Sequence, residues 1–143
     1  MAKILIVEDN ALNIKLFCDL LAAHGHEPEA VTDSRNALDA ARNFSPDLVI
    51  TDIQLPHVSG LDLIRMIRGD EHLAGVPIMA VTAYSARGDE ERIRAAGAQA
   101  YVSKPISVMK FAQTVDELLA SVRDKAPAEE TPGATEAAGG EEA

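Results

Sequence analysis

The stretch DLVITDIQLPHVSG, at residues 47–60, decides the fold. It begins with an apolar, mostly β-branched run at residues 48–50, which is typical of a strand buried on both faces of a sheet. Asp52 follows almost at once, and Pro56 and Gly60 then require the chain to turn and leave the sheet. A carboxylate is therefore expected at the carboxyl end of a strand, which is where open α/β sheets bind their ligands.

The rest of the chain alternates between strand-like and helix-like segments on both sides of this stretch. Apolar runs predict strands, and segments with helical periodicity and terminal capping residues predict helices. We expect strands at residues 3–7, 27–31, 46–51, 76–83 and 99–103, and helices at residues 10–25, 33–44, 61–68, 88–98 and 107–123. This alternation predicts an α/β three-layer sandwich, with a five-stranded parallel sheet in the flavodoxin-like (βα)5 order 2-1-3-4-5.

Residues 124–143 differ in composition from the rest of the chain. They contain no Ile, Leu, Val, Phe or Tyr and are rich in Ala, Glu, Gly and Pro. Such a segment cannot bury enough apolar area to offset the entropy cost of ordering it. We therefore expect one folded domain at residues 1–123 and a disordered acidic tail at residues 124–143.

The charge and hydropathy of the chain exclude several classes of partner. The formal net charge is -10, with 13 Lys and Arg against 23 Asp and Glu, whereas binding to nucleic acid needs clustered cations. No apolar run approaches the roughly 18 residues needed to cross a bilayer, and the start MAKILIVEDN does not resemble a secretory signal. We expect a cytoplasmic protein that binds neither DNA nor membranes.

Chemically active side chains follow four of the five predicted strands, at the edge where their carboxyl ends meet. They are Glu8, Asp9, Asp52, Thr82 and Lys104. Three carboxylates at one edge repel one another unless cations balance them, and one ammonium with one divalent cation would neutralise them. Because the ligands are hard oxygens without a convergent His or Cys, the favoured cation is Mg²⁺.

A magnesium ion held by few carboxylates commonly shares its remaining positions with phosphate oxygens, so phosphoryl chemistry is the leading hypothesis. Asp52 could act as a nucleophile and form an aspartyl phosphate. Asp9 would hold the metal, with Glu8 acting directly or through water. Lys104 and the Thr82 hydroxyl could each contact a phosphoryl oxygen.

The segments ILIVEDN, PDLVITDIQLPHVSG, VTA and VSKP, at these separations, resemble the receiver domain of bacterial two-component response regulators. The resemblance covers residues 2–122 and is closest to stand-alone receivers without an output domain. It implies a phosphoprotein in which Asp52 accepts the phosphoryl group from the phosphohistidine of a sensor histidine kinase or of a phosphotransfer protein. It also implies a signalling switch, which catalyses its own phosphorylation and slow dephosphorylation, rather than a metabolic enzyme.

The same resemblance implies further roles. The backbone carbonyl of Gln54 would complete the metal site, Thr82 and Tyr101 would form the coupled pair that reports phosphorylation, and the Lys104–Pro105 peptide would be cis. Partners would contact the first helix and the loop after the fifth strand, which implicates Asn10, Leu12, Asn13, Leu16, Pro105 and Ile106. The apolar residues of that helix also fit a helix buried on a wide face, so both readings stay open. We expect a monomer.

Three other functions compete with this interpretation. A flavin carrier needs an uncharged phosphate loop after the first strand, where Glu8 and Asp9 would repel a phosphate. An aspartate-based phosphatase needs a second aspartate two residues after the nucleophile, where this chain has Gln54. A phosphorylation-independent adaptor that binds and modulates a sensor kinase stays an open alternative.

Overall fold

The computed structural model describes residues 2–83, 87–104 and 106–130. In chain order its elements are β1 (Lys3–Val7), α1 (Ala11–Ala23), β2 (Glu27–Val31), the 3₁₀ helix η1 (Ser34–Asn36), α2 (Ala37–Phe44), β3 (Leu48–Asp52), α3 (Gly60–Arg68), β4 (Ile78–Thr82), α4 (Arg87–Ala96), β5 (Ala100–Ser103) and α5 (Val108–Glu130). The five strands form one parallel sheet in the order β2-β1-β3-β4-β5. The predicted fold class and strand order are therefore confirmed.

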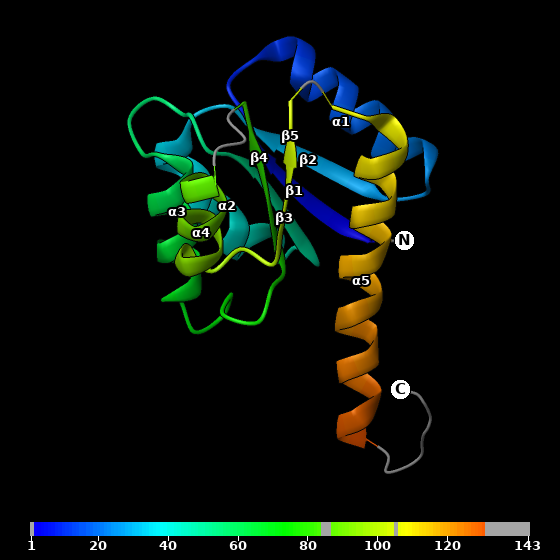
Figure 1. Ribbon diagram of the computed structural model, residues 1–143. Helices are drawn as coiled ribbons and strands as arrows, with labels where there is room; N and C mark the ends of the chain where they lie inside the picture. The colour runs from blue at the N-terminus through cyan, green and yellow to red at the C-terminus, as the bar shows by residue number, and fades with distance from the viewer. Residues whose placement is uncertain (1, 84–86, 105, 131–143) are drawn as a thin grey trace.

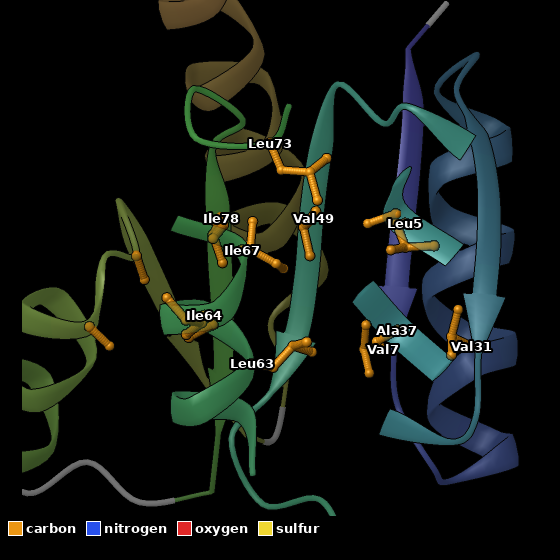
Figure 2. Close-up of a cluster of buried hydrophobic side chains, with 14 of the residues drawn as sticks. Leu5, Val7, Val31, Ala37, Val49, Leu63, Ile64, Ile67, Leu73 and Ile78 are labelled. Carbon is orange, nitrogen blue, oxygen red and sulfur yellow. The ribbon is translucent and has the colours of Figure 1, made fainter. Parts of the chain in front are cut away.

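Two layers of helices cover the sheet, with α1 and α5 on one face and α2, α3 and α4 on the other (Figure 1). Alternate residues of β1, β3 and β4 supply the two cores, as the pleat of a strand requires. On the α1/α5 face the rings of Phe17 and Phe111 stack with centroids 5.1 Å apart. Figure 2 shows the opposite core, where Leu63, Ile64 and Ile67 of α3 lie among buried side chains of the strands, such as Val49 and Ile78.

Most helix boundaries lie within two residues of the predicted ones, and two segments differ more. The segment expected as one helix at residues 33–44 begins as η1, because the Asp33 carboxylate accepts the Arg35 amide at 2.9 Å and tightens the first turn before α2 starts. At the other end α5 continues to Glu130, so residues 124–130 of the predicted tail are helical. The extent of the disordered tail stays a prediction. None of the described helices is long and apolar enough to cross a membrane.

The strand register places four chain positions at the same edge of the sheet. Val7 pairs with Thr51, Asp52 with Val81, and Thr82 with Ser103, so β1, β3, β4 and β5 all end there. All five residues of β3 and of β4 are buried. The two central strands therefore form a rigid base from which the residues at their ends project.

Candidate functional site

Three carboxylates meet at the carboxyl edge of the sheet. Glu8 directly follows β1, and Asp52 is the last residue of β3; the two are only 1% and 5% exposed. Asp9 is exposed, and one carboxylate oxygen from each of the three acids lies within 4.8 Å of the others. The structure thus brings together the three acids that the sequence predicted to converge.

Lys104 brings a positive charge to this cluster from the loop after β5. Its Nζ lies 2.8 Å from Asp52 Oδ2 and 3.8 Å from Glu8 Oε1. Its backbone amide donates to the Thr82 carbonyl oxygen at 2.8 Å, which fixes the start of the loop against β4. Burial alone would lower the pKa of Lys104, but the hydrogen bond to Asp52 and the surrounding carboxylates raise it, so the side chain is a cation at neutral pH.

Backbone amides hold the two buried carboxylates in place. The backbone N–H of Gln54 donates to Asp52 Oδ1 at 3.0 Å. Since Lys104 Nζ donates to Asp52 Oδ2, each carboxylate oxygen of Asp52 has a hydrogen-bond donor. The Asn10 amide likewise donates to Glu8 Oε2 at 3.1 Å. The carboxylate of Asp52 is therefore oriented before any ligand binds. The side chain of Gln54 is exposed, and its backbone lies beside the acids.

Among the described residues, the second carboxylate oxygen of Glu8 has no hydrogen-bond donor, so the charges of the cluster are not fully paired. Within the described part of the chain, Glu8 Oε1 is buried and receives no hydrogen bond. Burial and the neighbouring charge of Asp52 raise the pKa of Glu8 above its ordinary value. Among the described side chains, the ammonium of Lys104 is paired with Glu8 and Asp52 beside Asp9, so a further cation would relieve the repulsion among the three carboxylates. The three carboxylates are hard oxygen donors and could hold a metal ion.

The buried charge of Glu8 leads to a stability prediction. We expect Glu8→Gln to raise the Tm of the metal-free protein at pH 7 by about 4 °C, because it removes a buried charge beside Asp52. This corresponds to a rise of about 1 kcal/mol in the free energy of unfolding. Because the pKa of Glu8 is raised in the folded state, its ionisation destabilises the folded protein as the pH rises from the unfolded-state pKa of Glu8 to its folded-state pKa. The difference between variant and wild type should therefore vanish below pH 4.5, in thermal unfolding followed by circular dichroism. A Tm lowered at pH 7 would contradict this account.

Thr82 and Tyr101, the predicted switch pair, lie in different surroundings. Thr82 is the last residue of β4, is 1% exposed, and lies at the edge that carries the acids. Tyr101 lies within β5 and is half-buried against the core on the α2/α3/α4 face. Its hydroxyl donates to Glu90 Oε1 of α4 at 3.2 Å. The structure thus places Thr82 at the acidic edge and the hydroxyl of Tyr101 against α4.

The residues of α4 that contact Tyr101 were not predicted from the sequence. Glu90 accepts the tyrosine hydroxyl and also pairs with Arg94 Nε at 3.2 Å, while the Arg94 guanidinium lies 5.9 Å from the centroid of the Tyr101 ring. The hydrogen bond to Glu90 raises the pKa of Tyr101. The spacing of Glu90 and Arg94, four residues apart on a helix, was visible in the sequence, but their contact with β5 depends on the fold.

The described residues of the predicted partner-binding set lie on or just before α1 and α5, and two of them are exposed apolar side chains. Leu12 is 79% exposed and Leu16 is 37% exposed, one helical turn apart on α1. Asn10 caps this helix by accepting the Asn13 amide, and Ile106 packs against the core of the α1/α5 face. Val108 and Met109, exposed at the start of α5, were not predicted. Pro105 and the predicted cis peptide before it lie outside the described residues.

The sequence and the fold both place this chain among known proteins. Residues 4–116 match the response regulator receiver domain family, and the chain belongs to that family. Among its curated relatives is the polar-differentiation response regulator DivK of Brucella ovis, which is 51% identical over 116 residues covering 81% of this chain and 94% of the relative. DivK of Brucella anthropi is 50% identical over the same shares. The chain is thus the receiver domain of a DivK-like response regulator.

Solved structures agree with this assignment. The chemotaxis protein CheY4 of Vibrio cholerae has a TM-score of 0.79 at 25% identity, covering 82% of this chain and 98% of its own. The receiver domain of a sensor histidine kinase from Pseudomonas aeruginosa has a TM-score of 0.77 at 30% identity, covering 83% and 98%. That second structure has a magnesium ion coordinated in its active-site cleft.

Proposed function

We propose that this protein is a phosphorylation switch, in which Asp52 accepts a phosphoryl group from the phosphohistidine of a sensor histidine kinase or a phosphotransfer protein. The observation that carries the proposal is the placement of Asp52. Its two oxygens are held by Lys104 Nζ at 2.8 Å and by the Gln54 amide at 3.0 Å, beside two further acids. Membership of the receiver family supports it.

The residues around Asp52 would divide the chemistry among them. A carboxylate oxygen of Asp52 would attack phosphorus, the bond from phosphorus to the donor histidine nitrogen would break, and the imidazole would leave with that electron pair. Lys104 and the Thr82 hydroxyl would then contact phosphoryl oxygens at the end of the sheet. Because few protein groups here can relay a proton, turnover would be slow, as suits a switch.

The carboxylates of Glu8, Asp9 and Asp52, with the backbone carbonyl of Gln54, would hold Mg²⁺. Bound there, the ion would supply positive charge to the phosphoryl oxygens. The fit rests on the uncompensated negative charge and on the buried Glu8 oxygen without a hydrogen-bond donor among the described residues. Lys104 alone cannot balance three carboxylates.

The exposed apolar side chains of α1 and of the start of α5 would dock the partner that carries the histidine. Leu12, Leu16 and Met109 lie on α1 and α5, the helices that follow Asp9 and Lys104 in the chain. A partner placed there could bring its phosphohistidine to Asp52. The name of the Brucella relatives, polar-differentiation response regulator, supports a role in differentiation signalling.

Phosphorylation would be reported by Thr82 and Tyr101. A Thr82 hydroxyl drawn toward the phosphoryl group would free volume between β4 and α4, into which the ring of Tyr101 could turn. That movement requires Tyr101 to leave Glu90, which now accepts its hydroxyl. Such a switch needs about 1 to 3 kcal/mol of coupling between the two sites.

The direct test is incubation with Mg²⁺ and acetyl phosphate, followed by intact mass spectrometry. We expect the mass to rise by one phosphoryl group. Removal of the metal with EDTA is expected to slow uptake by at least about 100-fold, because three carboxylates would then repel the incoming phosphate. Uptake at the same rate in EDTA would contradict the metal site.

The alternative, an adaptor that modulates a sensor kinase without being phosphorylated, is favoured by one observation. The apolar surface of Leu12, Leu16, Val108 and Met109 could bind a helical partner whether or not Asp52 is modified. Partner affinity, measured by calorimetry with and without phosphorylation, separates the two. Equal affinity in both states would favour the adaptor.

A further inference from the structure

Ser34 is a buried polar residue outside the acidic cluster, and its hydroxyl bridges two backbone groups of the loop between β3 and α3. The residue is 2% exposed. Its Oγ donates to the Pro56 carbonyl oxygen at 2.7 Å and accepts from the Val58 amide at 3.1 Å. The hydroxyl of Ser34 therefore acts as a donor and as an acceptor to the same loop.

The two partners of Ser34 flank a strained residue. His57, between Pro56 and Val58, has a φ of 71°, in the left-handed region that residues with a side chain seldom adopt. A residue keeps such a conformation only where its surroundings hold it there. Ser34 holds the peptide groups on both sides of His57, so it acts as a clamp on the strained turn.

The clamped loop is the one that touches Asp52. Gln54 lies two residues before Pro56, and its amide donates to Asp52 Oδ1 at 3.0 Å. The far end of the loop is tied back by the Gly60 amide, which donates to the Ile53 carbonyl oxygen at 2.9 Å. Only Leu55 separates Gln54 from the turn at residues 56–58, and the loop is anchored at both ends. A shift of this turn would therefore also displace the backbone of Gln54.

We propose that Ser34 is a positioning residue for the acceptor site, an inference that rests on the proposed function. By clamping the turn around His57, Ser34 fixes the Gln54 backbone relative to Asp52 and to Mg²⁺ bound beside it. It acts through the loop and not on the phosphoryl group itself. Groups that orient metal ligands commonly matter for metal affinity almost as much as the ligands do.

The test compares Mg²⁺ binding by the full chain and its Ser34→Ala variant, using isothermal titration calorimetry. We expect the Kd for Mg²⁺ to rise about 10-fold. The matched control is Ile67→Val, in the core at the other end of α3, which should lower the unfolding midpoint and leave the Kd unchanged. If Ser34→Ala does not fold, Ser34→Cys takes its place, with a smaller rise in Kd expected.

A rescue experiment separates positioning from general stability. Glycine adopts positive φ without strain, so adding His57→Gly to Ser34→Ala should restore most of the Mg²⁺ affinity. A purely structural role of Ser34 predicts no recovery. An unchanged Kd in the Ser34 variant, with normal phosphoryl uptake by wild type, would overturn this inference alone. Absence of uptake by wild type would overturn the proposed function, and this inference with it.

Discussion

Replacing Asp52 with asparagine is expected to abolish phosphoryl uptake, lowering its rate by at least about 10³-fold. The asparagine side chain keeps the shape of aspartate, and its oxygen can still accept a hydrogen bond from the backbone N–H of Gln54. That oxygen is a poor nucleophile, however, and the NH₂ group would take the place of the carboxylate oxygen that contacts Lys104. The variant should fold, because it reduces the repulsion around Glu8. The measurement is intact mass after incubation with acetyl phosphate and Mg²⁺.

A matched control for this substitution is Asp62→Asn. Asp62 is an exposed carboxylate on α3 that pairs with Arg65, so the same chemical change there leaves the acidic edge intact. We expect the control to take up the phosphoryl group at the wild-type rate. Uptake that persists in the Asp52 variant would mean that another residue is the acceptor and would reject the proposed function.

The second large effect is expected from Gly60→Ala, at the start of α3. A Cβ at this position would collide with the backbone carbonyl oxygen of Asp52 and would lie 2.6 Å from the Ile53 Cα. Neither neighbour is a flexible side chain, so the start of α3 must move away from the end of β3. We expect the free energy of unfolding to fall by about 3 kcal/mol, measured by urea denaturation.

Gly75→Ala is the control for this prediction, because a Cβ at Gly75 would meet nothing within 4 Å. There the added methyl should be neutral or stabilise by about 0.5 kcal/mol through the unfolded state. Gly60→Ala should also slow phosphoryl uptake under conditions where it is folded, because the displaced backbone includes Asp52. An unfolding midpoint equal to that of the Gly75 variant would show that α3 adjusts without cost.

The sequence predicted the sheet and the acidic edge because both depend on local patterns and one topological rule. Apolar runs identified β1, β3 and β4, and the alternation with helices required parallel strands whose carboxyl ends meet. Once that edge was inferred, Glu8, Asp9, Asp52 and Lys104 were expected to be neighbours. Asp52 ends β3, and the other three follow β1 or β5 by one or two residues, so the strand ends largely determine their convergence.

The supporting residues could not be predicted in the same way. Ser34 contacts a loop 22 and 24 residues away, and a lone serine after a short strand has no pattern that points to it. Gly60 reads as an ordinary turn residue, and only the packing of α3 on β3 shows that a Cβ is excluded. The left-handed His57 likewise follows from tertiary contacts, since histidine has no local preference that requires it.

The contact between Tyr101 and Glu90 also gives the chain an optical signal of its own. The sequence has no tryptophan, two tyrosines and three weakly emitting phenylalanines, so phenol rings dominate its ultraviolet emission. A carboxylate that accepts a phenol hydrogen bond quenches that emission, as Glu90 would do for Tyr101. In a Tyr84→Phe variant, Tyr101 would be the remaining tyrosine, and its fluorescence intensity would rise when α4 moves away from β5. The movement could then be followed in real time without an attached dye.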